Sequence, residues 1–328
     1  MAKTRAIIAA IGALVLLTAV LTPGPAGAEP FRLGISTWVG YGPFFLARKK
    51  GYFKEEGLEL DLVKVEDVKV RFAALAAGRI DAMATTVDTL PLYLRPRGIR
   101  YQYLFAIDGS RGGDGVVAGK AIKSVADLRG KRVAFAEGSV SQFFLNVLLK
   151  EAGLEQSDIE AVHMSAGDAG SAFVSGQVDA AVTWEPWLTP GKRAAHGRLL
   201  ADSSERPGLI TNVVLAPAKA IRDREAEMKA LYRGWSRAVE FVRSNPREAN
   251  AIMAKGLGGW LKKPAAFAEA LRGVVFYDAA MNAAFFGTDV APGDLSRTIQ
   301  QALDVWSGLG KLQVQVRPRD LVNYSAVD

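Results

Sequence analysis

One order of secondary-structure elements occurs twice along this chain, and this repeat limits the possible folds more than any other feature. Gly57-Leu58 in the first unit corresponds to Gly153-Leu154 in the second, and residues 78–84 correspond to residues 176–182. In both units, helical patterns alternate with short apolar, β-branched runs, which is typical of α/β lobes built on parallel strands. The repeat therefore predicts two α/β lobes that face each other across a cleft.

The length of the chain fits two lobes, because 328 residues, of which 49% are hydrophobic, can bury two cores. We expect lobe 1 to comprise residues 29–112 and 216–328, and lobe 2 to comprise residues 113–215. Two crossing strands would form the hinge, and Gly112-Gly113 and Gly115 supply backbone freedom at the first crossing. The segment after the second crossing is predicted to be mainly helical and to pack on lobe 1.

The residue composition argues against several classes of function. The chain has no cysteine and two histidines, so thiolate chemistry and histidine-rich metal sites have few residues to build on. The formal net charge is +7, but lysine and arginine are scattered among acidic residues rather than gathered in one stripe. We therefore expect no metal, no cofactor and no nucleic-acid partner.

Residues 1–28 have the pattern of a signal peptide. Lys3 and Arg5 precede the apolar run 6–21, and Ala26-Gly27-Ala28 provides the small residues that signal peptidase needs. An uncleaved anchor helix is the alternative, but the apolar run is short for a membrane span. We expect cleavage before Glu29 and a soluble, monomeric protein in the periplasm.

Four loops are expected to line the cleft, because ligands of doubly wound sheets bind beyond the carboxyl ends of the strands. These loops are residues 36–43 and 85–88 in lobe 1, and residues 137–141 and 183–187 in lobe 2. They combine hydroxyls, aromatic rings and carboxylates, as small-molecule sites do. We predict ligand contacts from the following side chains: Trp38, Tyr41, Thr85, Thr86, Asp88, Asp114, Ser139, Ser141, Trp184 and Glu185.

These side chains also have a structural interpretation. Serine and threonine next to helix starts can be N-caps and nothing more. Trp38 and Trp184 are expected on opposite lobes, where they clamp a solute, and we favour Trp184 over Trp187. If the rings are ligand contacts in exposed loops, their removal weakens binding and leaves the unliganded protein stable, whereas removal of a core ring lowers stability.

The motifs of both units, taken together, resemble a known family. They are Ile35-Ser36-Thr37-Trp38 and residues 51–58, 74–81, 124–133 and 181–187. They look like the periplasmic substrate-binding components of ABC importers for nitrate, taurine, alkanesulfonates and thiamine-pyrimidine precursors. The resemblance implies the two-lobe periplasmic binding protein-like fold of type II, an α/β fold in which each lobe is a doubly wound, mostly parallel sheet flanked by helices. It also implies an ABC permease with its ATPase as partners.

Carboxylates near the expected cleft bear on the nature of the solute. They are Asp67, Asp88, Asp108, Asp114, Glu137 and Glu185. Unpaired carboxylates in a closed cleft are costly, so they either hold a cationic group of the solute or pair with cations such as Arg71 and Arg111. We therefore expect a small organic solute that is nitrogen-containing or sulfonate-like.

The sequence thus predicts a protein that binds one solute by lobe closure and has no catalytic residues. One alternative is a thiamine-pyrimidine-synthase-like enzyme on the same fold, against which stand the signal peptide and the lack of a recognisable nucleophile with its base. The other alternative is a periplasmic ligand sensor that uses the same cleft. A neighbouring gene pair for a permease and an ATPase would separate the importer component from the sensor.

Overall fold

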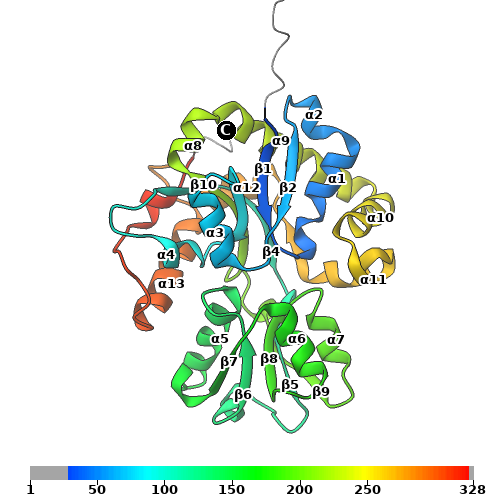
Figure 1. The fold of residues 1–328 in the computed structure, drawn as a ribbon, viewed down its shortest axis with the longest axis vertical. Helices are drawn as coiled ribbons and strands as arrows, with labels where there is room; N and C mark the ends of the chain where they lie inside the picture. Colours follow the sequence, from blue (N-terminus) through cyan, green and yellow to red (C-terminus); the bar gives the residue numbers. More distant parts are fainter. Residues whose placement is uncertain (1–28, 325–328) are drawn as a thin grey trace, which may run out of the picture.

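Two lobes, each built on one β-sheet, make up the computed structural model, which describes residues 29–324 (Figure 1). The predicted signal peptide, residues 1–28, lies outside the described residues. The six strands of the first sheet are, from edge to edge, β11 (Val274–Phe276), β4 (Tyr101–Ser110), β10 (Thr211–Pro217), β3 (Ala82–Thr86), β1 (Phe31–Ile35) and β2 (Leu60–Lys64). The five strands of the second sheet are β7 (Glu160–His163), β6 (Arg132–Phe135), β8 (Ala180–Trp184), β5 (Asp114–Gly119) and β9 (Gly197–Asp202).

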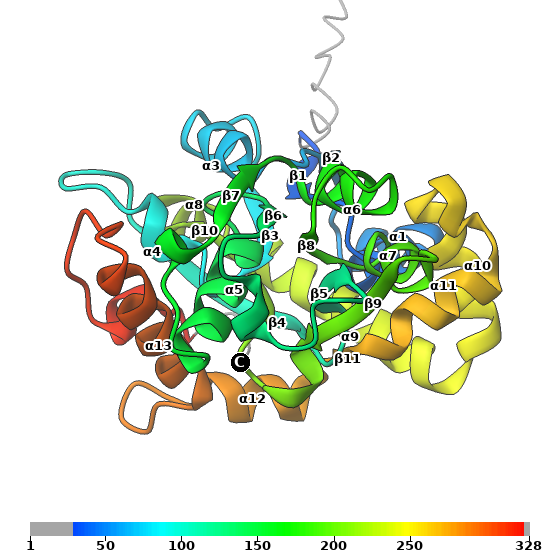
Figure 2. The same cartoon turned by 90° about the horizontal axis from the view of Figure 1, so that it is seen from below.

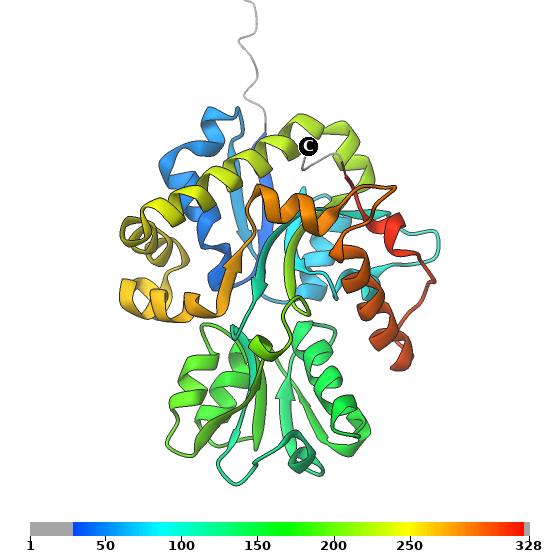
Figure 3. The same ribbon diagram turned by 180° about the vertical axis from the view of Figure 1, so that it is seen from behind.

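Helices flank both sheets, and two of those that follow β10, at residues 225–244 and 279–286, lie behind the first sheet (Figure 3). The α-helices of the first lobe are α1 (Gly42–Lys50), α2 (Tyr52–Glu55), α3 (Val68–Ala76), α4 (Leu90–Tyr93), α8 (Ala218–Asp223), α9 (Glu225–Ser244), α10 (Pro246–Leu257), α11 (Pro264–Ala270), α12 (Ala279–Phe286) and α13 (Asp294–Gly308). Those of the second lobe are α5 (Val140–Glu151), α6 (Ala166–Val174) and α7 (Leu188–Arg193). Short 3-10 helices are η1 (Val39–Tyr41), η2 (Val125–Leu128), η3 (Gln156–Asp158), η4 (Ser203–Glu205), η5 (Gly259–Lys262), η6 (Leu271–Gly273) and η7 (Pro318–Leu321).

The two repeat units form equivalent parts of the two sheets. In the first sheet β1 runs parallel to β2 and β3, and in the second sheet β6 runs parallel to β7 and β8. The remaining pairs are antiparallel, and both β5 and β10 carry the chain away from the hinge. Each sheet is therefore mixed, with a parallel half made by the repeat. The predicted two-lobe α/β fold class is confirmed.

The chain passes between the lobes twice. The first crossing, residues 111–113, joins β4 to β5, and the second, residues 203–210, joins β9 to β10. Gly112 has a φ of 103°, a left-handed conformation that glycine adopts without strain. All of β10 pairs within the first sheet, so the lobe boundary expected at residues 215–216 falls inside this strand.

A serine hydroxyl ties the two crossings together. Ser203 Oγ lies 2.7 Å from Ser110 Oγ and accepts a hydrogen bond from the backbone N–H of Gly112 at 2.8 Å. Ser110 and Ser203 are fully buried, so these polar groups satisfy one another away from water. The hinge is therefore a bonded unit rather than two independent strands.

Each lobe has its own core, and one helix joins the two. Trp235 of α9 is fully buried in the first lobe, where its ring centroid lies 4.5 Å from that of Phe44. Helix α13 follows the first lobe in sequence but lies beside α5 of the second lobe (Figure 2). Its Trp306 is fully buried, with its ring centroid 6.1 Å from that of Phe143. Within residues 29–324, no helix combines the length and apolar character needed to cross a membrane.

Candidate ligand-binding cleft

A cavity of about 750 Å³ lies between the two sheets and is lined from both lobes. We call it the cleft. Its size is within the range of small-molecule sites. Most of the predicted contact residues line it, namely Trp38, Tyr41, Thr85, Thr86, Asp114, Ser139 and Trp184. The structure thus brings together residues from loops that the repeat places at the carboxyl ends of strands in both sheets.

A hydrogen-bonded network at the base of the cleft fixes two aromatic rings. Asp108, on β4, accepts a hydrogen bond from Trp38 Nε1 at 3.0 Å and another from Asn212 Nδ2 at 3.0 Å. The Tyr41 hydroxyl donates to Asn212 Oδ1 at 2.9 Å. All four side chains are buried, so the network orients Trp38 and Tyr41 and satisfies the carboxylate with neutral donors.

Trp38 is a core residue as well as a cleft residue. Its side chain is 4% exposed and packs in the main core of the first lobe, although we expected a ring in an exposed loop. The reason is that the loop after β1 turns directly into η1 and α1, which places Trp38 against Gly113 at the hinge. The stability of the unliganded protein therefore depends on Trp38.

Trp184 reaches across the cleft from the second lobe. It is the last residue of β8, it is half-buried, and its Nε1 donates a hydrogen bond to the backbone oxygen of Thr37 at 2.9 Å. Its ring also contacts that of Trp187, with a centroid distance of 5.8 Å. Trp187, the ring that we did not favour, lines the cleft as well. The second lobe thus presents a pair of indoles to the cavity.

The hydroxyls in the cleft are partly engaged in local structure. Ser139 is the N-cap of α5, since its Oγ accepts from the Ser141 backbone N–H at 3.2 Å. Its hydroxyl also donates to the backbone oxygen of Ala136 at 2.7 Å. Thr85 Oγ1 lies 2.8 Å from Thr89 Oγ1. The structural interpretation of Ser139 is therefore confirmed, and Ser139 also lines the cleft.

Three predicted contact residues do not line the cleft. Asp88 is 2% exposed and lies in the turn after β3, where its backbone oxygen accepts from Trp306 Nε1. Ser141 is buried on the first turn of α5, and its Oγ has no hydrogen-bond partner among residues 29–324. Glu185 points into a different pocket. Loop position alone did not separate these residues from their neighbours, because adjacent residues in a loop face different directions.

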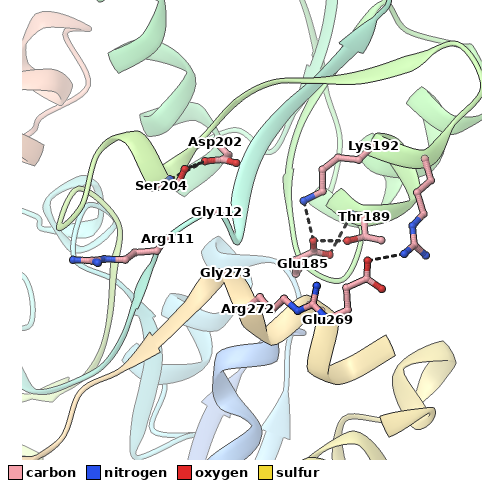
Figure 4. Close-up of a pocket in the computed structure, with 12 residues that line it drawn as sticks. Arg111, Gly112, Glu185, Thr189, Lys192, Asp202, Ser204, Glu269, Arg272 and Gly273 are labelled. Carbon is pink, nitrogen blue, oxygen red and sulfur yellow. Dashed lines mark hydrogen bonds and ion pairs between the residues drawn. The ribbon is translucent and has the colours of Figure 1, made fainter. Parts of the chain in front are cut away.

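The second pocket, of about 420 Å³, lies beside the first crossing and is called the hinge pocket (Figure 4). It is lined by Arg111, Gly112, Glu185, Thr189, Lys192, Arg193, Asp202, Ser204, Glu269, Ala270, Arg272 and Gly273. Glu185 Oε1 accepts from Thr189 Oγ1 at 2.6 Å and lies 3.6 Å from Lys192 Nζ. Arg193 and Glu269 form an ion pair of 2.5 Å between the lobes. The carboxylates of this pocket thus have partners within the protein.

Burial governs the ionisation of the cleft carboxyls. It raises the pKa of Asp108 from its usual 3.8 to about 7, against the two hydrogen bonds from Trp38 and Asn212. Burial also raises the pKa of Asp114 to about 7, and the neighbouring negative charge of Glu185 adds to this rise. In the opposite sense, burial lowers the pKa of Arg71, a cleft-lining guanidinium on α3.

Several residues that line the cleft were not among the predicted contacts. They include Arg71, Tyr93, Trp187, Asn212 and Lys311. The sequence did contain a sign that Arg71 could line the cleft, because it is a cation between the apolar residues Val70 and Phe72 in the first part of a helix. The sequence contained no such sign for Lys311, because this residue follows α13 and lies outside both repeat units.

Comparison with known proteins identifies relatives of this fold. The family model described as NMT1/THI5 like matches residues 38–249. A protein of Brucella abortus named as a binding protein is 28% identical over 259 residues, which cover 78% of this chain and 79% of that protein.

Two solved structures share the architecture. The periplasmic aliphatic sulphonate binding protein of Escherichia coli has a TM-score of 0.73 and 22% identity, covering 91% of this chain and 99% of that chain. The periplasmic nitrate-binding protein of Synechocystis PCC 6803 has a TM-score of 0.69 and 16% identity, covering 91% of this chain and 87% of that chain. At these identities the similarity shows a common fold. Because the family model matches more than half of the chain, the chain belongs to the NMT1/THI5-like family, in agreement with the resemblance of its motifs.

Proposed function

We propose that this protein is the periplasmic solute-binding component of an ABC importer, rather than an enzyme. It captures a small organic solute, nitrogen-containing or sulfonate-like, and delivers it to a membrane permease with its ATPase. In this proposal residues 1–28 are removed as a signal peptide, and the exported chain acts as a monomer. The chain up to the first crossing and the chain from β10 onward act as one lobe, and the chain between the two crossings acts as the other, so that the predicted boundary at residues 215–216 moves to the start of β10.

The observation that carries the proposal is a cleft of about 750 Å³ between two sheets, and within residues 29–324 the chain passes between these sheets at two crossings. Such a hinge allows one lobe to close on the other around a solute. Closure removes the solute from water, which strengthens each polar contact, and it creates a shape that a permease can recognise. Family relatives named as binding proteins for sulphonate and nitrate support this mechanism.

The proposed contacts are the cleft-lining members of the predicted set. Tyr41, Trp38 and Trp184 offer aromatic faces, Thr85, Thr86 and Ser139 offer hydroxyls, and Asp114 offers a carboxylate. A wrong solute leaves some of these polar groups unpaired, at about 1–3 kcal/mol for each group. Specificity would therefore come from a few hydrogen bonds within an otherwise aromatic cavity.

The test is a thermal-shift screen of the exported protein against sulfonates, nitrogenous compounds and pyrimidines. A solute at about 100 times its dissociation constant adds about 2.7 kcal/mol to the free energy of unfolding. Calorimetry on the best solute should then give one site per chain, and mass spectrometry should recover the solute unchanged. Conversion of the solute would favour the enzyme alternative, and the lack of any stabilising solute would contradict the proposal.

A further inference from the structure

Two charged side chains that line the cleft are buried without a counter-ion. Arg71 is 4% exposed and Asp114 is 5% exposed, and neither forms an ion pair within residues 29–324. The other charged residues of the cleft wall are exposed to water or paired, as Glu137 is with Lys311 at 2.8 Å. Burial of an unpaired charge is unfavourable, so these two positions differ from the rest of the wall.

Arg71 has hydrogen-bond capacity that the protein leaves unused. Its Nη1 donates to the backbone oxygen of Val65 at 2.6 Å and to that of Glu66 at 3.5 Å. Its Nε is buried and has no acceptor among the described residues. A guanidinium has five N–H donors in a planar fork that matches an oxyanion. An acidic group of a solute would supply the missing acceptor and the missing negative charge.

Asp114 lies among aromatic side chains of the same cavity. It begins β5 and pairs in register with Trp184, and its backbone N–H donates to Ser110 Oγ at 3.0 Å. The charged group that acts most strongly on it is Glu185, another carboxylate. Trp38, Tyr41 and Trp184 line the cavity with it. Carboxylates together with aromatic faces are the groups that hold a positively charged nitrogen.

The two groups occupy different parts of the cleft. Arg71 lies on α3 of the first lobe and is hydrogen-bonded to the backbone oxygens of Val65 and Glu66, whereas Asp114 begins β5 of the second lobe, beside the first crossing. Tyr41 lines the same cavity as Arg71 and Asp114, and its hydroxyl donates to Asn212 Oδ1 at 2.9 Å. A single solute in this cavity can therefore meet both groups with opposite ends.

We infer that the solute of this cleft is zwitterionic, with its acidic group on Arg71 and a positively charged nitrogen at Asp114. The inference rests on the proposed function, and it narrows the solute to a molecule that carries both charges. Simple sulfonates and simple amines would each satisfy one of the two groups and leave the other unpaired. The zwitterion satisfies both at once.

Calorimetry with matched probes tests the inference on the unchanged protein. The probes are 3-aminopropanesulfonate, 1-propanesulfonate and propylamine, and the comparison of 4-aminobutanoate with butanoate covers carboxylates. The two zwitterions are 3-aminopropanesulfonate and 4-aminobutanoate. At least one of them should bind at least ten times more tightly than the probes that carry only one of its two charges. This comparison needs no variant, so it decides the question even if a substitution prevents folding.

Variants assign the two ends. Asp114→Asn should weaken binding of the zwitterion at least tenfold without weakening binding of 1-propanesulfonate, whereas Arg71→Met should weaken both. Asp202→Asn, a matched carboxylate-to-amide change in the hinge pocket, is the control and should change neither. If neither 3-aminopropanesulfonate nor 4-aminobutanoate binds more tightly than its single-charge counterparts, or if the Asp114→Asn protein keeps full affinity for the zwitterion that binds, the inference is overturned and the proposed function still stands. A protein that no small solute stabilises would overturn both.

Discussion

The cleft and the hinge pocket lie beside the same crossing of the chain, and they differ in how their charges are paired. In the hinge pocket, Glu185 has Thr189 and Lys192 as partners, and Glu269 pairs with Arg193. In the cleft, Arg71 and Asp114 are as buried as Glu185 but have no counter-ion within the described part of the chain. Charged lining alone therefore does not distinguish a ligand site from a structural one.

The difference shows where a ligand is needed. A buried charge with its partner in the same fold contributes to a fixed geometry, whereas a buried charge without one is unfavourable until something binds to it. The buried carboxylate of the hinge pocket has its partners in the absence of a solute, whereas Arg71 and Asp114 of the cleft have no counter-ion within the described residues. For this reason we place the solute in the cleft, although sequence position alone had grouped Glu185 with the cleft residues.

The largest effect on stability is expected from removal of an aromatic ring in the wall of the cleft. Trp38→Ala should lower the free energy of unfolding of the unliganded protein by about 3–5 kcal/mol, because the ring is core-buried and donates to Asp108. Urea denaturation measures this change. Trp187→Ala, a partly exposed indole of the same cleft, is the control and should cost clearly less. An unchanged unfolding midpoint for Trp38→Ala would mean that the ring is only a ligand contact.

The next effect is a dependence of stability on pH. Asp88, Asp108 and Asp114 have pKa values raised to about 7 by burial, so between about pH 4 and pH 7 the folded state holds more protons than the unfolded state. Their contribution to stability is therefore fully present below pH 4 and is lost as the pH rises through 7. Each carboxyl lowers the free energy of unfolding by up to about 1.4 kcal/mol per pH unit in this window.

Asp114→Asn provides the check on this pH dependence. The amide does not titrate, so the unliganded variant should show a shallower loss of stability between pH 5 and pH 8 in denaturant titrations. The same slope in the variant and in the unchanged protein would show that Asp114 is already ionised in the folded state, and the contrast between the two pockets would then be weaker.

A direct comparison of the pockets gives a smaller effect. Lys192→Met should cost about 1–3 kcal/mol, because it leaves the carboxylate of Glu185 buried with only Thr189 as a donor. Asp114→Asn at pH 8 should cost nothing or stabilise the unliganded protein, because it removes a buried charge that has no partner. Thermal unfolding measures both changes. If the two substitutions lower the melting temperature equally, the buried carboxylates of the two pockets do not differ in whether they have a counter-ion.

The smallest effect is expected at the rim of the cleft. Lys311 and Glu137 form a partly exposed ion pair between the lobes, and such pairs contribute about 0–1 kcal/mol. Lys311→Ala should therefore weaken solute binding by no more than about fivefold, and the effect should vanish in 1 M salt. Lys219→Ala, which removes an exposed pair within one lobe, is the control. A tenfold or larger loss with Lys311→Ala would show that the rim helps to decide affinity.

Much of the fold and part of the cleft could be predicted from the repeat. Parallel strands and intervening helices follow from local periodicity, and the carboxyl ends of such strands meet at one edge of a sheet. That geometry was enough to bring Tyr41, Thr85, Ser139 and Trp184 into one cavity. These features depend on residues that are close in sequence, and the sequence by itself determined them.

Other features depend on contacts between distant residues, and only the tertiary structure decided them. Trp38 donates to Asp108, 70 positions away, and Lys311 pairs with Glu137, 174 positions away. The docking of α13 on the second lobe and the direction of Glu185 are of the same kind. Whether a buried charge has a partner is settled by such contacts, because hydrogen bonds and ion pairs act over a few ångströms in space whatever the separation along the chain. The sequence alone identified the charged residues near the cleft. Only the tertiary structure decided that Glu185 has a counter-ion and that Arg71 and Asp114 have none within residues 29–324.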